Sequence, residues 1–360
     1  MVGLLKKKSI EKIVASYELP GLGASVRDIG GHYQVEIKGR HCKLALTLDF
    51  PCEGLRSVIT SDLEKAVSAL AAIDEVDVSL NSMIFSHVPC GDKSPMRNVK
   101  NIIAVASGKG GVGKSTTSVN LALALSQEGA RVGILDADIY GPSIPMMLGI
   151  SDDIRPEQVD GKYFKPIVRH GIQSLSMGNL VTENTPVVWR GPKASGALLQ
   201  LCQQTLWDDL DYLIIDLPPG TGDIQLTLAQ NIPVTGAVVV TTPQDIALLD
   251  AQKAIEMFAK VHIPILGVVE NMSVHTCSAC GHTEHIFGQE GGARIADSYE
   301  TVLLGALPLS ISIREQVDGG IPSVVAEPDG DIAQAYRMIA RRAALGITLM
   351  EKSNAIPTVS

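Results

Sequence analysis

Three things are scarce in this sequence of 360 residues: aromatic side chains, basic charge and long apolar runs. Aromatic residues make up 4% of the chain and hydrophobic residues 45%, which predicts a globular α/β protein with an aliphatic core. The formal net charge is -9, and no basic stripe is interleaved with aromatic residues, which argues against a nucleic-acid surface. We therefore expect protein partners and no nucleic acid.

The sequence has too few long apolar runs for a membrane-spanning or secreted protein and too few cysteines for a disulfide-stabilised one. No run approaches the ~20 apolar residues that a membrane-spanning helix needs, and no apolar stretch of a secretory signal follows Lys6, Lys7 and Lys8. Six cysteines are too scattered for a disulfide framework in a chain of this size: Cys42, Cys52, Cys90, Cys202, Cys277 and Cys280. The sequence therefore predicts a cytoplasmic protein without a membrane span.

Glycine, in contrast, is concentrated in one loop with the pattern G-x-x-x-x-G-K-S/T. This loop reads Gly108-Lys109-Gly110-Gly111-Val112-Gly113-Lys114-Ser115-Thr116. It follows an apolar run typical of a buried strand, 102–106, and precedes a segment with helical periodicity, 118–127. Its glycines let backbone N–H groups converge on phosphate, Lys114 adds positive charge, and Ser115 offers a hydroxyl to Mg²⁺. The loop therefore predicts a binding site for a nucleoside triphosphate.

Aspartates end two further apolar runs. Asp136 and Asp138 follow the predicted strand 131–135, and Asp216 is the last residue of the predicted strand 211–216. Because the carboxyl ends of parallel strands meet at the ligand-binding edge of a sheet, these carboxylates are expected beside the phosphate loop. Asp216 is then suited to accept a hydrogen bond from Mg²⁺-bound water. For Asp136 and Asp138 the alternative role is to cap the helix that follows. The combination predicts ATP and Mg²⁺ as cofactors.

Lys109 is an additional lysine within the phosphate loop. On the loop alone it could be an ordinary solvated side chain, but the pattern Lys109-Gly-Gly-Val-Gly-Lys114 resembles the deviant Walker A motif of MinD, ParA and Mrp/ApbC ATPases. In that family the extra lysine crosses a two-fold interface to the partner's phosphates. The resemblance implies a homodimer closed by ATP.

The same resemblance implies roles for residues near the loop. Lys109 and Lys114 are expected to act in catalysis together with Asp138, which orients the attacking water, while Asp136 supports the magnesium site. Asn271 follows the predicted strand 265–270 and is expected to bind adenine, and a turn-forming asparagine is the alternative. The magnesium ligands or their supports are expected to be Ser115, Asp136 and Asp216.

The chain is expected to contain an N-terminal domain, a linker, an ATPase domain and a tail: 1–87, 88–98, 99–346 and 347–360. The first is predicted as an α+β unit with the order helix, strand, strand, helix, strand over 6–16, 33–37, 42–48, 56–73 and 76–80. This order resembles the MIP18 (DUF59) domain. Cys52 then aligns with a cysteine of that domain. Its thiol could be reactive, an auxiliary metal ligand or structural. The second domain is predicted as an α/β P-loop NTPase with a mainly parallel sheet flanked by helices.

Cys277 and Cys280 form the sole pair of cysteines with the spacing of metal ligands. Two thiolates supply half of a tetrahedral site. Either His282 and His285 complete a zinc site, or a second chain supplies two more thiolates around one iron–sulfur cluster, or the pair acts in redox chemistry. The residues by themselves leave these three alternatives open.

Several segments resemble the Mrp/ApbC iron–sulfur cluster carriers. They are Asn271-Met272-Ser273, Cys277-Ser278-Ala279-Cys280-Gly281, Leu307-Pro308-Leu309, Asp318-Gly319-Gly320-Ile321-Pro322 and Trp189-Arg190-Gly191-Pro192. The resemblance implies an ATPase that holds a 4Fe–4S cluster at a homodimer interface through Cys277 and Cys280. Its partners would be assembly scaffolds and apo client proteins. The alternative is a MinD/ParA-like positioning ATPase in which the two cysteines hold structural zinc.

Overall fold

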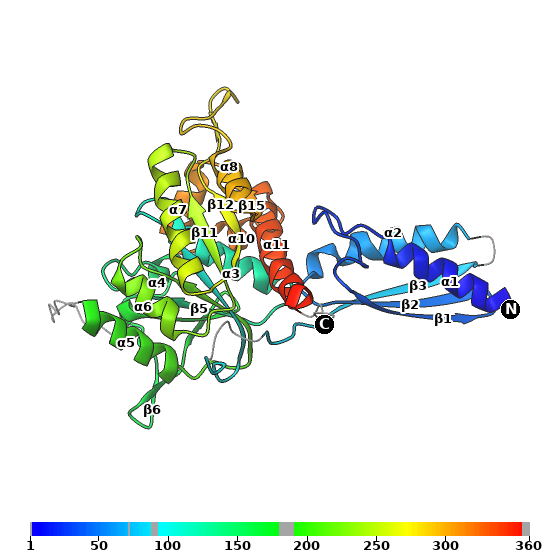
Figure 1. Ribbon diagram of the computed structural model, residues 1–360, viewed down its shortest axis with the longest axis horizontal. Coiled ribbons are helices and arrows are strands. Elements are labelled where there is room, and N and C mark those ends of the chain that lie inside the picture. Colours follow the sequence, from blue (N-terminus) through cyan, green and yellow to red (C-terminus); the bar gives the residue numbers. More distant parts are fainter. Residues whose placement is uncertain (1, 71–72, 88–92, 180–190, 355–360) are drawn as a thin grey trace, which may run out of the picture. The chain divides into compact units, whose positions relative to one another are not determined.

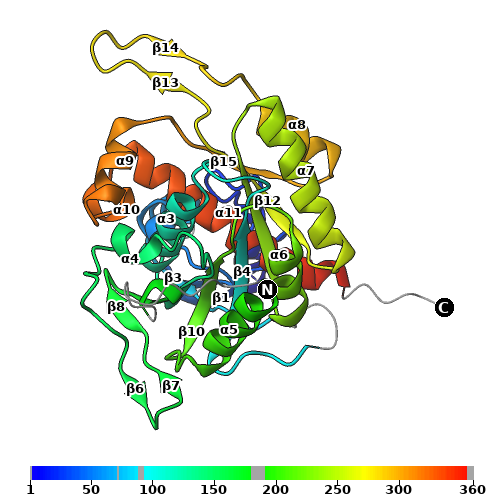
Figure 2. The same cartoon turned by 90° about the vertical axis from the view of Figure 1, so that its left-hand side faces the viewer.

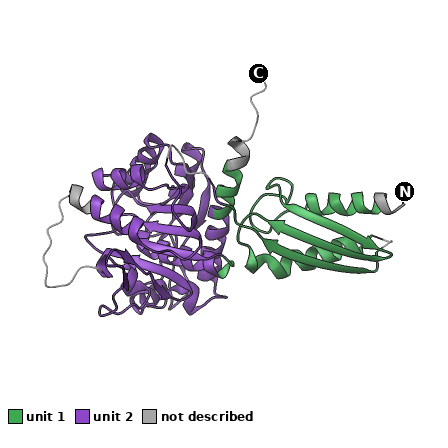
Figure 3. Cartoon of the chain, turned by 90° about the horizontal axis from the view of Figure 1, so that it is seen from below, with its two compact units in different colours: residues 1–85, 127–129, 344–360 green, residues 86–126, 130–343 purple. Residues whose placement is uncertain are grey.

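The computed structural model describes residues 2–70, 73–87, 93–179 and 191–354. The chain divides into two compact units, which are coloured separately in Figure 3. The first unit is built mainly from the residues up to 85, together with 127–129 and the end of the chain from 344. The second unit comprises residues 86–126 and 130–343. No helix in the described ranges is both long and apolar enough to cross a membrane.

The first unit is an α+β arrangement with a three-stranded sheet (Figure 1). Alternate residues of its central strand are buried, namely Cys42, Leu44, Leu46 and Leu48, as expected for a strand with one face in a core. The predicted order of helices and strands is confirmed: α1 Val2–Ala15, β1 His32–Lys38, β2 His41–Leu48, α2 Arg56–Ser68 and β3 Glu75–Ser82. Strand β2 pairs antiparallel with β1 and parallel with β3.

An eight-stranded sheet forms the centre of the second unit, in the order β15-β12-β11-β4-β10-β5-β9-β8. Its strand pairs are parallel except for β8 with β9, which confirms the predicted mainly parallel sheet. Every residue of β10 is buried, as expected for a strand covered on both faces. The strands are β4 Val99–Ala106, β5 Val132–Asp136, β8 Ile167–Arg169, β9 Ile172–Ser176, β10 Leu210–Asp216, β11 Gly236–Thr241, β12 Ile265–Glu270 and β15 Leu303–Ala306.

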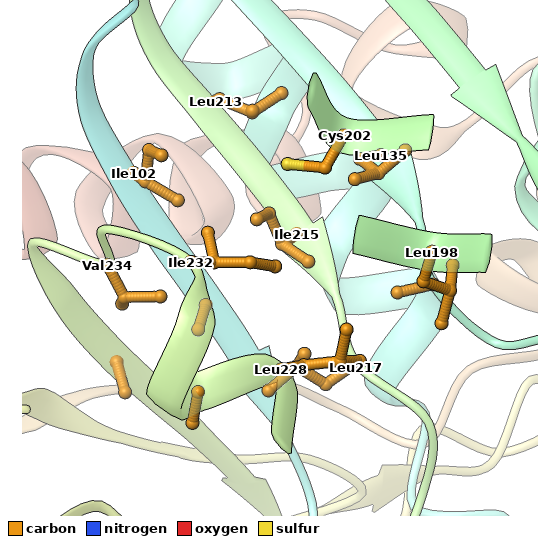
Figure 4. Packing of buried hydrophobic residues seen from close by; sticks show 14 of the residues in the cluster. Ile102, Leu135, Leu198, Cys202, Leu213, Ile215, Leu217, Leu228, Ile232 and Val234 are labelled. Carbon is orange, nitrogen blue, oxygen red and sulfur yellow. The ribbon is translucent and has the colours of Figure 1, made fainter. Parts of the chain in front are cut away.

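Helices flank this sheet. Side chains of β4 and β10 pack with α5 and α6 into one hydrophobic cluster, in which Figure 4 shows Ile215, Leu198 and Leu228. Helices α7 and α8 extend the packing over β11 and β12. The helices that lie in this unit or begin in it are α3 Lys114–Gln127, α4 Ile144–Met147, α5 Gly191–Gln204, α6 Asp223–Asn231, α7 Asp245–Lys260, α8 Gly291–Ser298, α9 Ile311–Asp318, α10 Ser323–Ala326 and α11 Asp331–Asn354.

Two short hairpins complete the second unit: β6 Gln158–Val159 with β7 Tyr163–Phe164, and β13 His275–Thr276 with β14 Thr283–Glu284. Helix α11 continues to Asn354, beyond the boundary expected at 346, and its apolar positions remain buried as far as Ile347. Several expectations lie wholly or partly outside the described residues: the segment Trp189-Arg190, Cys90, and parts of the linker and of the tail.

Candidate functional site

The predicted phosphate loop connects β4 to α3 at the carboxyl edge of the parallel sheet. Gly113 has a φ of +84°, and a Cβ at this position would lie 2.1 Å from Asn271 Nδ2. Both the left-handed backbone and the close approach require glycine. The Asn271 amide donates to the carbonyl oxygen of Val112 at 2.9 Å, across 159 positions of sequence. The structure thus brings the predicted adenine-binding residue against the phosphate loop.

Asp216 lies at the centre of a group of polar side chains from the end of the phosphate loop and the first turns of α3. Its Oδ2 is 2.7 Å from Lys114 Nζ and accepts a hydrogen bond from Ser115 Oγ at 2.6 Å. Its Oδ1 accepts from Ser118 Oγ at 2.6 Å. Lys114 and Asp216 are both almost fully buried, so their charges compensate each other in a site of low dielectric constant. The hard oxygen donors of Ser115 and Asp216 are a chemically suitable pair for Mg²⁺.

Asp136 is fully buried beside this group, at the end of β5. Its Oδ1 accepts from the backbone N–H of Asp138, and its Oδ2 accepts from those of Ser143 and Ile144 and from Ser176 Oγ, at 3.0 to 3.2 Å. Burial, and then the charge of Asp216, raise the pKa of Asp136 to about 7. These contacts make Asp136 the anchor of the loop that carries Asp138.

Asp138 is less buried than Asp136 and lies on that loop. Its Oδ1 accepts a hydrogen bond from the backbone N–H of Gly141 at 3.2 Å, so the carboxylate caps the turn that follows it. The turn that follows Asp216 is held by the backbone N–H of Gly220, which donates to the carbonyl of Ser107 at 3.0 Å. The turn after Asp216 therefore lies beside the phosphate loop, and the segment that carries Asp138 lies beside the end of β10, where the backbone N–H of Ala137 donates to the carbonyl of Asp216 at 3.0 Å.

Lys109 extends from the loop toward the N-terminal end of α7. Its Nζ is 3.4 Å from Oε1 of Gln244, the residue that precedes the helix. Its backbone carbonyl accepts a hydrogen bond from Ser107 Oγ at 2.9 Å. Lys109 thus belongs to the site but makes no contact with Asp216 or Asp136 among the interactions of the described residues.

The two cysteines with metal-ligand spacing lie between the strands of the β13–β14 hairpin, which Figure 2 shows extending from the second unit. The backbone N–H of Cys277 donates to His282 O at 2.8 Å, and that of Gly281 donates to Cys277 O at 2.8 Å, which forms a tight turn around the pair. Cys277 is partly exposed and Cys280 exposed, and both thiols are free. Hydrogen bonds from the backbone N–H groups of Ala279 and Cys280, and from the Cys280 thiol, lower the pKa of Cys277.

No group of three or more His, Cys, Asp or Glu side chains is placed to hold a metal ion in the described part of the chain. His285 Nδ1 instead donates to the backbone carbonyl of Ser273 at 2.8 Å, because a carbonyl can only accept. A zinc site made by Cys277, Cys280, His282 and His285 of one chain is therefore not assembled. The two sulfur donors suit iron, and they supply half of the four thiolates that usually hold an iron–sulfur cluster.

Four side chains at the site were not identified from the sequence. Ser118 and Ser176 bind the buried carboxylates, Gln244 meets Lys109, and Glu270 ends β12 and accepts from the backbone N–H of Gly292 in α8. Glu270 carried a recognisable signal, because it is a carboxylate at the end of a buried parallel strand, as Asp216 is. The roles of the two serines and of Gln244 depend on contacts between distant elements.

Known families and proteins share much of this sequence. A ParA family model, described as NUBPL iron-transfer P-loop NTPase, matches residues 98–344. An iron-sulfur cluster carrier protein of Pseudomonas fragi is 58% identical over 79% of this chain and 99% of its own length. The protein of the same name from Escherichia coli K12 is 57% identical over 81% of this chain and 78% of its own length. The mouse iron-sulfur cluster transfer protein NUBPL is 51% identical over 69% of this chain and 78% of its own length.

Solved structures give a consistent fold. A nucleotide-binding protein of Archaeoglobus fulgidus in complex with ADP has a TM-score of 0.57 and 36% identity, over 65% of this chain and 90% of that one. The cell division ATPase MinD of Pyrococcus furiosus has a TM-score of 0.51 over 70% of this chain and 99% of its own. At 23% identity, the MinD similarity supports the fold alone.

Proposed function

Because the chain belongs to the family of NUBPL iron-transfer P-loop NTPases, we propose that it carries iron–sulfur clusters to apo client proteins in an ATP-dependent cycle. The observation that supports this most directly is the pair of accessible thiols, Cys277 and Cys280, on a hairpin that begins five residues after β12 at the nucleotide edge of the sheet. Relatives of 51–58% identity carry the names of cluster carrier or transfer proteins. A positioning ATPase is supported by similarity of fold alone.

The cargo is proposed to be a 4Fe–4S cluster held between two copies of the chain. Cys277 and Cys280 offer two thiolates per chain, and the described residues supply no further ligands in reach. A closed two-fold arrangement brings two identical hairpins together and provides four thiolates. The protein is thus proposed to act as a homodimer that receives clusters from assembly scaffolds in the cytoplasm, where thiols remain reduced.

Nucleotide binding is proposed to use the phosphate loop, residues 108–116, with Lys114 for the phosphates and Asn271 for adenine. Mg²⁺, held by Ser115 and through water by Asp216, would neutralise charge on the β- and γ-phosphates. Asp136 would keep the following loop in position through its four hydrogen bonds. Asp138, on that loop, would orient the water that attacks the γ-phosphate.

Hydrolysis is proposed to require the partner chain. Lys109 is not engaged by the buried carboxylates of its own site, and its Nζ contact at 3.4 Å to Gln244 is long for a hydrogen bond. It is therefore available to neutralise phosphate charge across a dimer interface. ATP would stabilise the closed dimer, and hydrolysis would remove those contacts, so that the two states differ in how the cluster is enclosed.

Anaerobic reconstitution with iron and sulfide tests the carrier function. We expect the wild-type protein to bind about four iron and four sulfide per dimer and to pass them to an apo-enzyme. The double variant Cys277→Ala/Cys280→Ala should bind no cluster but retain nucleotide binding, whereas Cys202→Ala, which removes a buried thiol, should reconstitute normally. A colourless wild-type protein that retains zinc would contradict the proposal.

A further inference from the structure

The hairpin that bears the two cysteines is fastened to the nucleotide-binding edge by a histidine on each of its sides. His275 lies in β13, and its Nδ1 donates to the backbone carbonyl of Leu309 at 3.2 Å. His285 follows β14 directly, and its Nδ1 donates to the carbonyl of Ser273 at 2.8 Å. We call His275 and His285 the histidine clamp. Neither side chain is used by the cycle proposed above.

The clamp connects the hairpin to the residue that contacts the phosphate loop. Ser273, which accepts from His285, is two residues after Asn271, whose amide donates to Val112 O in the loop. Met272 between them has a φ of +57°, a left-handed conformation that a non-glycine residue adopts only when its surroundings fix it. The backbone is thus held rigidly between the loop and the point where the clamp attaches.

A second set of hydrogen bonds joins the same segment to the residues that directly follow β15. The backbone N–H and Oγ of Ser273 both donate to Leu307 O, at 2.9 and 3.0 Å. The backbone N–H of Leu309 donates to Val274 O at 2.8 Å, so the carbonyl that receives His275 is itself part of this structure. The strands of the hairpin are paired at two positions, and the histidine clamp adds a side-chain hydrogen bond from each of its sides to the rest of the unit.

We infer that His275 and His285 are positioning residues that make the placement of Cys277 and Cys280 follow the state of the nucleotide loop. This inference deepens the proposed function, on which it rests, by naming the physical link between the two sites. A nucleotide that shifts Val112 moves Asn271 through their hydrogen bond, and the rigid segment 272–274 carries the movement to both sides of the hairpin. Without the two Nδ1–H donors, the hairpin would move independently of the nucleotide.

Thiol reactivity of the cluster-free protein tests the inference. Alkylation of Cys277 and Cys280 by iodoacetamide is followed by peptide mass spectrometry, without nucleotide, with Mg-ADP and with a non-hydrolysable ATP analogue. In the wild type we expect the alkylation rate to change about fivefold or more with nucleotide. In His275→Ala/His285→Ala this ratio should approach one, while the affinity for nucleotide stays as in the wild type.

Two further variants separate positioning from a general loss of structure. His282→Ala changes an exposed histidine of the same hairpin whose ring makes no hydrogen bond among the interactions found for the described residues, and it should preserve the wild-type ratio. His275→Asn/His285→Asn places an amide N–H near each lost Nδ1–H and should restore the nucleotide dependence. A wild-type ratio of one, or an unchanged ratio in a folded alanine variant, would overturn the inference.

This experiment is independent of cluster chemistry. If reconstitution shows that the protein holds no iron–sulfur cluster, the carrier function fails, but the alkylation ratio still reports whether nucleotide controls the hairpin. If clusters bind and transfer normally while the ratio is insensitive to the clamp, the carrier function stands and the coupling through His275 and His285 fails. The two proposals therefore have distinguishable failures.

Discussion

At the scale of single residues, the site depends on how two carboxylates are buried. Asp216 is neutralised by Lys114 at 2.7 Å, whereas Asp136 has four hydrogen-bond donors and no cation among the interactions found for it. Desolvation therefore dominates at Asp136 and favours its protonated form, which accounts for its raised pKa. The sequence places both residues at strand ends but does not distinguish their environments.

The raised pKa of Asp136 predicts how stability depends on pH. With a native pKa of about 7, the folded protein retains a proton that the unfolded chain has lost, so the stabilisation is complete below the unfolded pKa of about 4 and is lost as the pH rises through 7. Without Mg²⁺ and nucleotide, the free energy of unfolding should therefore decrease over this range. Asp136→Asn should flatten the decrease, as measured by urea unfolding at several pH values. Equal slopes for the two proteins would contradict the assignment.

The cysteines should differ sharply in reactivity. Burial raises the pKa of Cys202 to about 12, and Cys42 and Cys52 are also buried. At pH 8 the thiolate fraction of Cys202 should be about a thousandfold below that of an ordinary thiol, so alkylation should occur first at Cys277 and Cys280. Peptide mass spectrometry after brief alkylation measures this, with the urea-unfolded protein as the control. Rapid labelling of Cys52 in the folded protein would contradict this expectation and favour a reactive cysteine at that position.

At the scale of helices and strands, apolar runs in the sequence predicted central strands of the sheet. The continuous apolar runs of β4, β10, β11 and β12 are recognisable because both faces of a parallel strand are covered. Short elements such as α4, α10 and the strands of the β13–β14 hairpin have too few residues to show a period. Their conformation is set by contacts with the rest of the unit, as the histidine clamp illustrates for the hairpin.

Two glycines allow a matched test of packing in these elements. A Cβ at Gly133 in β5 would lie 2.5 Å from Leu210 Cδ1, so Gly133→Ala should destabilise the protein by about 1–3 kcal/mol. A Cβ at Gly196 in α5 would have no atom within 4 Å, so Gly196→Ala should stabilise by about 0.5–1 kcal/mol through helix propensity. Thermal unfolding of both variants measures the difference. If the two substitutions shifted the melting temperature in the same direction, this prediction would be contradicted.

At the scale of the whole molecule, the two lysines of the phosphate loop should have separable roles. Lys114 is buried at the site of its own chain, so Lys114→Ala should abolish tight ATP binding. Lys109 is proposed to act across the dimer, so Lys109→Ala should bind ATP but dimerise poorly and hydrolyse ATP about a thousandfold more slowly. Sedimentation with and without Mg-ATP and a phosphate-release assay measure these effects. Wild-type ATP-dependent dimerisation and hydrolysis in Lys109→Ala would refute the role in trans.

Local patterns in the sequence were sufficient to predict the phosphate loop, the strand-end aspartates, the cysteine pair and the mainly parallel sheet. These features are local: each depends on residue types at fixed spacing, and that spacing follows from the geometry of one strand, one turn or one helix. The same holds for the order of elements in the first unit, while its likeness to the MIP18 domain stays a prediction.

The tertiary structure alone decided which of these residues touch. Asn271 and Val112, Ser118 and Asp216, and His285 and Ser273 are brought together by sheet order and by turns whose energies depend on surroundings distant in sequence. It also decided that Asp136 is buried without a cation among the interactions found for it, and that His285 is committed to a backbone carbonyl. Local patterns cannot encode such contacts, because hydrogen bonding and desolvation depend on what the rest of the fold places around each group.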